Sequence, residues 1–471
     1  MPPLKHPSLS ETLELPTRPA RIAAETDVLV VGGGPAGMGA ALGAASEGVR
    51  VILAERYGFL GGNATAALVM PFMSYHTQSA REEVGGSENL FPPDHGPGEP
   101  VIKGALSFLI KRLVRSGGAI PPSPQTGYVV PFDPEVFKWV ALDLLDEAGV
   151  EFLFHSFASG VIGRGQLEGV IFETKSGPIV IRATVVVDCT GDGDVAVQAG
   201  APYQIGDEKG WVQPMTLMFL IMGFDRMAFG TYVRDHPDQW LGVHGLWELI
   251  SQAHEAGELV LPREDILFFG TTHEQEVIVN STRITKVLGT DVWDLTYAER
   301  QGRRQMRQIA RFLMKHVPGF EKSYISQSGA TVGVRETRRI TGEYQLTVND
   351  VLSGRRFEDG IARCSYPLDI HNSLGTGTLL KRLPAGQAYD IPLRCLLPLG
   401  TENLLVAGRC ISGSREALSS YRIMPVSVAT GQAAGLCAAL SIQGNCPPRR
   451  IPLQHVRERL AQQNRVLESR E

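Results

Sequence analysis

The chain has 471 residues, which is too long for one hydrophobic core and indicates two domains. Its hydrophobic fraction of 43% and charged fraction of 20% are typical of a soluble globular protein, and its net charge of −5 gives no general attraction to nucleic acid. No run of about 18 apolar residues, the length that a transmembrane helix needs, is visible, and the polar start has no apolar signal segment.

A strand–turn–helix–strand unit opens the folded part of the sequence. Its parts follow in this order: an apolar strand at 28–31, the turn Gly32-x-Gly34-x-x-Gly37, a helix of small residues at 36–47, and a strand at 49–53 that leads to Glu55. The three glycines alone would be a weak signal. In this context they predict a dinucleotide-binding turn.

Each part of this unit has its own role. Gly32 allows the tight turn, Gly34 lets a pyrophosphate approach the backbone, and Gly37 lets the helix pack closely on the strand. The helix N-terminus offers free N–H groups and a partial positive charge to the phosphates. Glu55 stands where an acid accepts hydrogen bonds from a ribose, and an acid there favours FAD or NAD over NADP.

Three further segments favour FAD over NAD. They are the stretch 55–65 with its Gly61-Gly62 pair, the strand at 185–188 that leads to Thr190-Gly191-Asp192, and the strand at 403–407 that leads to Gly408-Arg409 and the helix beginning at Pro425. Each resembles a cofactor-binding segment of two-dinucleotide-binding-domain flavoproteins. From about residue 25 to 445 the chain resembles the bacterial FAD-dependent oxidoreductase family, which is related to the fumarate reductase and succinate dehydrogenase flavoproteins.

The resemblance implies an FAD cofactor that is bound non-covalently, because His76 is not where succinate dehydrogenase-like flavoproteins attach flavin to histidine. We expect Pro425 at the first helical position, so that the N–H groups of about Val426 to Val428 point at the flavin O2 and stabilise the reduced anion. The implied cofactor-binding residues are Gly32, Gly34, Pro35, Ala36, Gly37, Glu55, Arg56, Gly61, Gly62, Asn63, Ala64, Thr190, Gly191, Asp192, Gly408, Arg409, Pro425, Val426 and Ser427.

The implied fold is α/β: a Rossmann-like FAD-binding domain of the glutathione reductase type, with a β-meander and an inserted α+β substrate domain. The expected boundaries are 22–205 for the first part of the FAD-binding domain, 206–391 for the insert, 392–446 for the C-terminal part and 447–471 for a charged tail.

Local patterns add detail to this plan. Asp133-Pro134 predicts a capped helix that ends near Gly149, and 104–115 predicts a shorter helix. Glycine- and proline-rich stretches at 85–100 and 117–131 are interpreted as excursions over the cleft. Strand-like stretches at 151–154, 157–162, 167–174, 178–182 and 184–188 predict the meander. Arginines at 300, 303, 304, 307 and 311 have helical spacing and are interpreted as a solvated helix face.

His371 is the first candidate for the catalytic base. It lies in a loop with Gly and Asn just before the chain returns to the FAD-binding domain, and a pKa near neutrality suits proton removal during hydride transfer. A structural histidine, or one that hydrogen-bonds the flavin, is the alternative.

Arg335 and Tyr421 are the other catalytic candidates. Arg335, Arg338 and Arg339 form a basic cluster that either binds a carboxylate or flavin carbonyl, or pairs with Glu336 and Glu343. Tyr421, together with Arg415 and Arg422, lies between the halves of the C-terminal motif and is expected to line the cleft.

No second strand-linked GxGxxG is present, since Gly375-Thr376-Gly377 lacks the third glycine, so no separate NAD(P)H domain is expected. The expected function is an FAD-dependent oxidoreductase that transfers a hydride between a small organic substrate and the flavin N5. The alternatives are a fumarate reductase-like enoate reductase using Arg335 and Arg394, a flavin monooxygenase, and a non-enzymatic flavin electron carrier. The second electron partner is unknown; a homo-oligomer is left open, and no nucleic-acid partner is expected.

The cysteines at 189, 364, 395, 410, 437 and 446 form no CxxC pair. We therefore expect no metal or redox dithiol, and interpret them as buried thiols of a cytoplasmic protein. Cys410, next to the C-terminal motif, is the one candidate among them for a contact with the active site, and a buried thiol is the favoured interpretation for it as well.

Overall fold

The computed structural model describes residues 13–14, 19–78, 89–91, 98–375 and 377–470. Most of the predicted excursion at 85–100, and Thr376 of the Gly375-Thr376-Gly377 segment, lie outside these residues.

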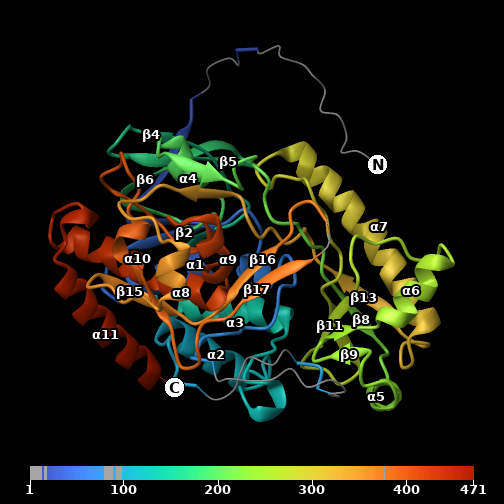
Figure 1. The fold of residues 1–471 in the computed structure, drawn as a ribbon. Helices are drawn as coiled ribbons and strands as arrows, with labels where there is room; N and C mark the ends of the chain where they lie inside the picture. The colour runs from blue at the N-terminus through green and yellow to red at the C-terminus, as the bar shows by residue number, and fades with distance from the viewer. Residues whose placement is uncertain (1–12, 15–18, 79–88, 92–97, 376, 471) are drawn as a thin grey trace.

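A seven-stranded sheet forms the core of the first domain (Figure 1). Its strands lie in the order β3 (Glu151–Leu153), β2 (Val51–Ala54), β1 (Arg21–Val31), β6 (Gly177–Asp188), β5 (Gly169–Thr174) and β4 (Phe157–Ile162), with β19 (Leu404–Val406) also paired to β6. The pairs β3–β2, β2–β1, β1–β6 and β6–β19 are parallel, whereas β6, β5 and β4 form an antiparallel meander. The predicted strands at 178–182 and 184–188 are one continuous strand, whose first half pairs with β5 and whose second half pairs with β19.

Two helices of small residues, α1 (Pro35–Ala45) and α10 (Met424–Gln443), pack against each other almost backbone to backbone. A Cβ added at Gly39 would lie 2.2 Å from the Val428 carbonyl oxygen, and one at Gly435 would lie 1.9 Å from the Ala40 carbonyl oxygen. Larger side chains cannot fit there, which explains why Gly occupies these positions where the two helices meet. This packing fixes the two helix N-termini next to each other.

Helix α10 is long and apolar enough to cross a membrane by length and composition, which the search for apolar runs did not show. However, 89% of its apolar window is buried inside the protein, as in the core helix of a soluble protein.

The helices predicted at 104–115 and after Asp133 are both present, and the segment predicted as a charged tail contains a third helix. Helices α2 (Ala105–Arg115) and α3 (Pro134–Asp146) form as expected, and the Asp133 carboxylate caps α3 by accepting from the N–H of Glu135 at 2.7 Å. The predicted tail at 447–471 contains α11 (Leu453–Ser469), which packs on α2 and α10 and buries Val456 and Leu467.

A second, six-stranded sheet forms the core of the insert. Its strands lie in the order β13 (Tyr324–Ser328), β8 (Phe219–Met222), β12 (Glu276–Val279), β11 (Ile266–Gly270), β10 (His244–Gly245) and β9 (Trp240–Leu241). On β8, Phe219 and Ile221 belong to the second hydrophobic core, whereas Leu220 packs into the first. The sheet therefore separates the two cores.

Three helices accompany the second sheet: α5 (Arg226–Asp235), α6 (Trp247–Glu255) and the long α7 (Val292–His316). On α7, Arg303 pairs with Glu299, and the other four predicted arginines are exposed. Figure 1 shows these helices on one side of the molecule and α10 and α11 on the opposite side.

The chain rejoins the first core earlier than the predicted boundary at 391. From Ile340 onward the buried side chains, including Leu346, Val351 and Leu368, pack with the first core. This part of the chain holds β14 (Arg338–Ile340), which pairs with β7 (Tyr203–Ile205), β15 (Gly360–Cys364), which pairs with β18 (Tyr389–Pro392), and the hairpin of β16 (Leu368–His371) and β17 (Thr378–Lys381). It also holds the short helices α8 (Val348–Leu352) and α9 (Arg415–Tyr421), whereas the short helix α4 (Asp194–Gln198) directly follows β6. Figure 1 shows the β16–β17 hairpin between the two halves of the molecule.

Candidate functional site

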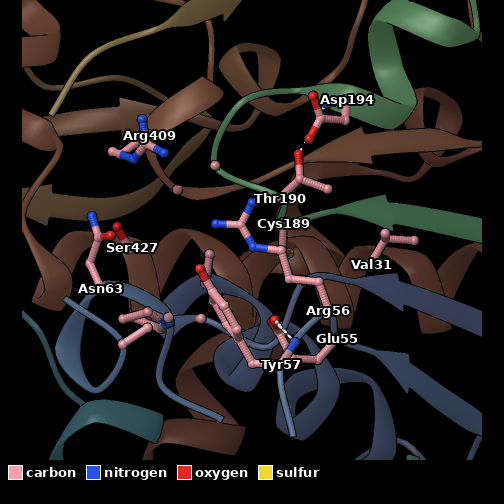
Figure 2. A pocket seen from close by; sticks show the side chains of 18 of the residues that line it. Val31, Glu55, Arg56, Tyr57, Asn63, Cys189, Thr190, Asp194, Arg409 and Ser427 are labelled. Atoms are coloured by element: carbon pink, nitrogen blue, oxygen red, sulfur yellow. Dashed lines mark hydrogen bonds between the residues drawn. The ribbon is translucent and has the colours of Figure 1, made fainter. Parts of the chain in front are cut away.

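A cleft with about 1020 Å³ of open space, its mouth included, lies at the carboxyl ends of β1, β2 and β6 (Figure 2). This is where open α/β sheets bind nucleotides. Of the predicted cofactor-binding residues, those that line it are Gly32, Gly34, Pro35, Ala36, Glu55, Arg56, Gly62, Asn63, Thr190, Gly191, Gly408, Arg409 and Ser427.

The other predicted cofactor-binding residues do not line the cleft; they are Gly37, Gly61, Ala64, Asp192, Pro425 and Val426. Gly37 acts in packing, because a Cβ there would lie 1.7 Å from the Gly32 carbonyl oxygen. Gly61 has a φ of +107°, which favours glycine, and it bends the chain so that Gly62 comes to lie opposite Gly34.

Residues that the sequence did not single out also line the cleft. Ser156, Phe157 and Ala158 reach it because the Ser156 N–H donates to the Glu55 carbonyl oxygen at 3.0 Å. Thr331 reaches it from the insert, and its N–H donates to the Ala66 carbonyl oxygen. Among the described cysteines, Cys189 lines the cleft, whereas the predicted Cys410 is fully buried behind it.

Glu55 is buried at the end of β2, and both of its carboxylate oxygens accept backbone hydrogen bonds. Oε2 accepts from the Gly33 N–H at 2.6 Å and Oε1 from the Tyr57 N–H at 2.9 Å. Burial raises the pKa of Glu55, and these two hydrogen bonds oppose the rise. The carboxylate thus fixes the glycine turn, and its remaining lone pairs are available to ribose hydroxyls.

The turn after β6 is fixed by Asp188, which is fully buried. Its Oδ1 accepts from the N–H and hydroxyl of Thr190, and its Oδ2 accepts from the Ala196 N–H. Burial and the charges of Asp192 and Asp188 raise the pKa of the cleft-lining Asp194 to about 6. This turn therefore presents Thr190 and Gly191 to the cleft in a fixed conformation.

Arg409 connects three distant segments of the chain. Its Nη2 donates to Asp192 Oδ1 at 2.9 Å, and the same oxygen accepts from the Thr337 hydroxyl at 2.7 Å. Its Nη1 is buried and has no hydrogen-bond partner among the described residues. Figure 2 shows Arg409 on the wall opposite Glu55 and Arg56. An unpartnered, positively charged donor at this position fits a pyrophosphate.

The helix α10 begins at Met424, one residue before the predicted start, so Pro425 is its second residue. The Ser427 N–H already donates to the Ile423 carbonyl oxygen at 3.0 Å. The free N–H groups at this positive helix end are therefore those of Met424 and Val426, rather than those of residues 426 to 428.

The lining residues of the cleft fit FAD. Gly34 has φ −73°, and a Cβ there would have only the Gly62 Cα, at 3.7 Å, within 4 Å, so open space adjoins two glycines where a pyrophosphate would lie. Glu55 marks the ribose end. Asn63, Met424 and Ser427 mark the other end, where the flavin would lie beside the start of α10.

His371 lies at the end of β16 in a polar cluster next to that flavin end. Its Nε2 lies 3.3 Å from Asp369 Oδ2, and its Nδ1 lies 3.0 Å from the Thr378 hydroxyl. Asp369 also accepts from Arg422 Nη2 at 3.0 Å, and Arg422 lines the cleft. Burial lowers the pKa of His371 to about 4; Asp369 opposes this shift, and Arg335 and Arg422 add to it. The imidazole is therefore neutral at pH 7.

The predicted basic cluster divides into three arginines with different partners. Arg338 pairs with Asp194 at 2.8 Å and Arg339 pairs with Glu336 at 2.9 Å. Arg335 instead donates to the Pro214 carbonyl oxygen, to the Thr216 hydroxyl and to Asn280 Oδ1. Glu343 pairs with Arg449. Of the three, Arg335 alone has no carboxylate partner among the described residues.

Three residues that were predicted to contribute, Tyr421, Arg394 and Arg415, do not line the cleft. Tyr421 is fully buried, its hydroxyl donates to the Ile411 carbonyl oxygen at 3.0 Å, and burial raises its pKa well above the usual range. The prediction that it lines the cleft is therefore wrong. Arg394 forms a two-pronged ion pair with Asp359 and does not line the cleft, and Arg415 lines a separate surface hollow.

The sequence profile of the family described as "FAD dependent oxidoreductase" matches residues 27–460. The chain is also 32% identical over 171 residues to digeranylgeranylglycerophospholipid reductase 1 of Methanopyrus kandleri, a match that covers 36% of this chain and 40% of the length of that curated relative.

Two solved structures resemble the whole chain at low identity. A geranylgeranyl bacteriochlorophyll reductase-like protein from Thermoplasma acidophilum matches with a TM-score of 0.46 and 14% identity, over 94% of this chain and 86% of the other. A p-nitrophenol 4-monooxygenase from Pseudomonas putida matches with a TM-score of 0.44 and 11% identity, over 95% of this chain and 90% of the other.

Proposed function

The chain belongs to the FAD-dependent oxidoreductase family, and from this premise we propose that it transfers a hydride between a small organic substrate and N5 of the flavin, with His371 as the base. The chain is thus an enzyme with an FAD cofactor, and the non-enzymatic electron carrier is set aside. The family match leaves the particular reaction open.

One observation supports the proposed reaction above the others. Arg422 lines the flavin end of the cleft and also binds Asp369, the carboxylate partner of His371. A neutral, half-buried imidazole is therefore connected to the cofactor site through two residues, Asp369 and Arg422. Proton removal from an alcohol or amine during hydride transfer needs such a group.

The residues around His371 suit it to this role. FAD, when bound, supplies the hydride acceptor or donor. A neutral imidazole has one donor and one acceptor nitrogen, and the Asp369 carboxylate requires the donor at Nε2. The acceptor is then Nδ1, which faces a hydroxyl that is free to rotate away. Asp369 orients the ring and stabilises the imidazolium that forms when Nδ1 takes a proton.

The alternatives receive less support from the described residues. A fumarate reductase-like enoate reductase built on Arg335 and Arg394 loses one of its two arginines, because Arg394 is bound to Asp359. A flavin monooxygenase would show NAD(P)H oxidation that a substrate stimulates, together with a hydroxylated product.

The experiment that tests the proposed function is anaerobic mixing of the purified enzyme with a panel of alcohols, amines and 2-hydroxy acids. At least one class should bleach the visible absorption band of the flavin and yield one equivalent of oxidised product per flavin. Bleaching by NAD(P)H alone, with product formed only when oxygen is added, would instead favour the monooxygenase.

The cofactor is expected to be released by acid. The described contacts are polar, and the cleft-lining nucleophile Cys189 is buried with a pKa raised well above its usual range by burial, so no covalent link is expected. Precipitation with acid should leave FAD in the supernatant, as identified by chromatography. A yellow pellet, or FMN in the supernatant, would contradict this expectation.

Replacing Glu55 by alanine is expected to weaken FAD binding by about 1.5–3 kcal/mol, the usual value of a hydrogen bond to a charged group. This loss includes the two hydrogen bonds that the carboxylate accepts from the N–H groups of Gly33 and Tyr57. Calorimetric titration of the deflavinated protein with FAD gives the affinity. The reduction potential of the bound flavin should not change, because Glu55 lies at the ribose end; a large shift at full occupancy would exclude a ribose contact.

A further inference from the structure

The arginines around His371 outnumber the carboxylates that face them. Four guanidinium groups gather here, those of Arg263, Arg283, Arg335 and Arg422, and two aspartates lie among them. Arg263 pairs with Asp265 at 2.9 Å and Arg422 with Asp369 at 3.0 Å. Arg283 and Arg335 have no ion pair with any described carboxylate, so two positive charges are uncompensated.

Among the described residues, the side chains of these two arginines donate hydrogen bonds to neutral oxygens alone. Arg335 donates to a carbonyl, a hydroxyl and an amide oxygen, as described above, and Arg283 Nη2 donates to the carbonyl oxygens of Asn372 and Gly377, both at 3.0 Å. Burial lowers the pKa of Arg335 to about 9, and the charge of Arg422 adds to this shift. Burial also lowers the pKa of Arg283. A partly buried positive charge that has no ion-pair partner is costly.

Three buried N–H donors in the same cluster also lack partners in the part of the chain that the structure describes. They are Arg283 Nε, Arg422 Nε and Gln213 Nε2. Gln213 is 1% exposed and Arg283 is 5% exposed, so water does not satisfy them from outside. Gln213 belongs to the His371 site, because its Oε1 accepts a hydrogen bond from the backbone N–H of His371 at 3.3 Å. Buried N–H donors normally have a hydrogen-bond acceptor, and these three have none among the described residues.

We propose that the substrate carries an oxyanion, a carboxylate or a phosphate, which Arg335 binds together with the unpartnered donors of Arg283 and Gln213. Such a group supplies both the negative charge and the acceptor oxygens that the cluster lacks. Arg335 is partly exposed, so a ligand can reach it. The proposal deepens the proposed function and rests on it, since the oxyanion would hold the reacting carbon of the substrate beside the flavin end and His371.

The test is a titration of the oxidised holoenzyme with succinate, inorganic phosphate and the neutral succinamide, at constant ionic strength set with potassium chloride. The visible difference spectrum of the bound flavin reports binding. Succinate or phosphate should produce a saturable change and succinamide none, and the stronger of the two anions identifies the oxyanion. In Arg335→Gln the Kd of that anion should rise by about 10- to 100-fold. Arg307→Gln, the same charge change on the exposed face of α7, should leave the Kd unchanged.

A second variant tests the proposal independently in case Arg335→Gln does not fold. Gln213→Glu keeps the size of the side chain and still accepts the His371 N–H, but it supplies the missing negative charge from within the protein. It should retain FAD and lose anion binding. Anion binding that is no tighter than that of succinamide, or that survives both Arg335→Gln and Gln213→Glu, would overturn the proposal.

The two proposals fail in different ways. If an uncharged metabolite reduces the flavin at full rate while succinate and phosphate do not bind, the oxyanion site is wrong and the hydride-transfer function stands. If the anions bind through Arg335 but no metabolite of the panel reduces the flavin, the proposed function is wrong and the oxyanion site stands.

Discussion

Replacing Gly34 by alanine is expected to give a folded protein that does not retain FAD. The backbone at Gly34 has φ −73° and ψ −174°, which any residue adopts, and the added Cβ would have only the Gly62 Cα, at 3.7 Å, within 4 Å. In the holoenzyme, however, this Cβ takes the space of the pyrophosphate. Adding FAD at 100 times its wild-type Kd should stabilise deflavinated wild type by about 2.7 kcal/mol and the variant by nothing measurable.

A neighbouring glycine provides the contrast. A Cβ at Gly37 would lie 1.7 Å from the Gly32 carbonyl oxygen, so Gly37→Ala should destabilise the protein even without cofactor. Thermal unfolding of the deflavinated proteins separates the two cases: Gly34→Ala should match wild type and Gly37→Ala should unfold at a lower temperature. Stoichiometric FAD in purified Gly34→Ala would mean that the pyrophosphate does not lie at this turn.

Replacing His371 by alanine is expected to slow flavin reduction by about 10²–10⁴-fold while FAD stays bound, the usual size of a general-base contribution. His371 does not line the cleft itself, so FAD content should remain close to that of wild type. The measurement is single-turnover reduction in a stopped-flow instrument, normalised to bound flavin. A normalised rate within a few-fold of wild type would assign proton transfer to another group.

The pH dependence of that rate tests the state of His371. The base must be neutral to act, and its pKa is lowered to about 4, so the rate should be constant near neutrality and fall as the pH drops through about 4. Arg335 contributes to the lowering, so Arg335→Gln should move this decline to higher pH, toward the ordinary histidine value of about 6.5. A decline that stays in place in the variant would show that the titrating group is not His371.

Features that depend on neighbouring residues in the sequence could be predicted well. The glycine turn and the cap of α3 each follow from the stereochemistry of a few adjacent residues, and each has the predicted form. Glu55 lines the cleft directly after β2, and its contact with a ribose stays a prediction. The prediction of a charged tail at 447–471 was an error of a different kind, because the sequence pattern of helix α11 was present. Val456, Leu460, Gln463 and Leu467 have helical spacing, and this stripe packs against the first core or is buried.

Features that depend on contacts between distant residues could not be predicted. Phe157 reaches the cleft only because β4 begins beside Glu55, and Thr331 only because the insert meets the chain at Ala66. The arginines at 335, 338 and 339 were predicted to act as one basic cluster. In the structure, Arg338 and Arg339 each form an ion pair with an acidic residue, whereas Arg335 forms none with a described residue. Which arginine remains without an acid is decided by tertiary packing, and the proposed oxyanion site depends on that outcome.

The most direct test of hydride transfer uses enzyme reconstituted with 5-deaza-FAD, in which a hydride received at C5 does not exchange with water. A substrate found in the panel is labelled with deuterium at its reacting carbon, and the flavin is analysed by mass spectrometry after a single turnover. The proposed function predicts one deuterium per flavin, carried directly from substrate carbon to C5. Reduced flavin that carries no deuterium, or no reduction by a substrate that reduces the FAD enzyme, would contradict hydride transfer at this site.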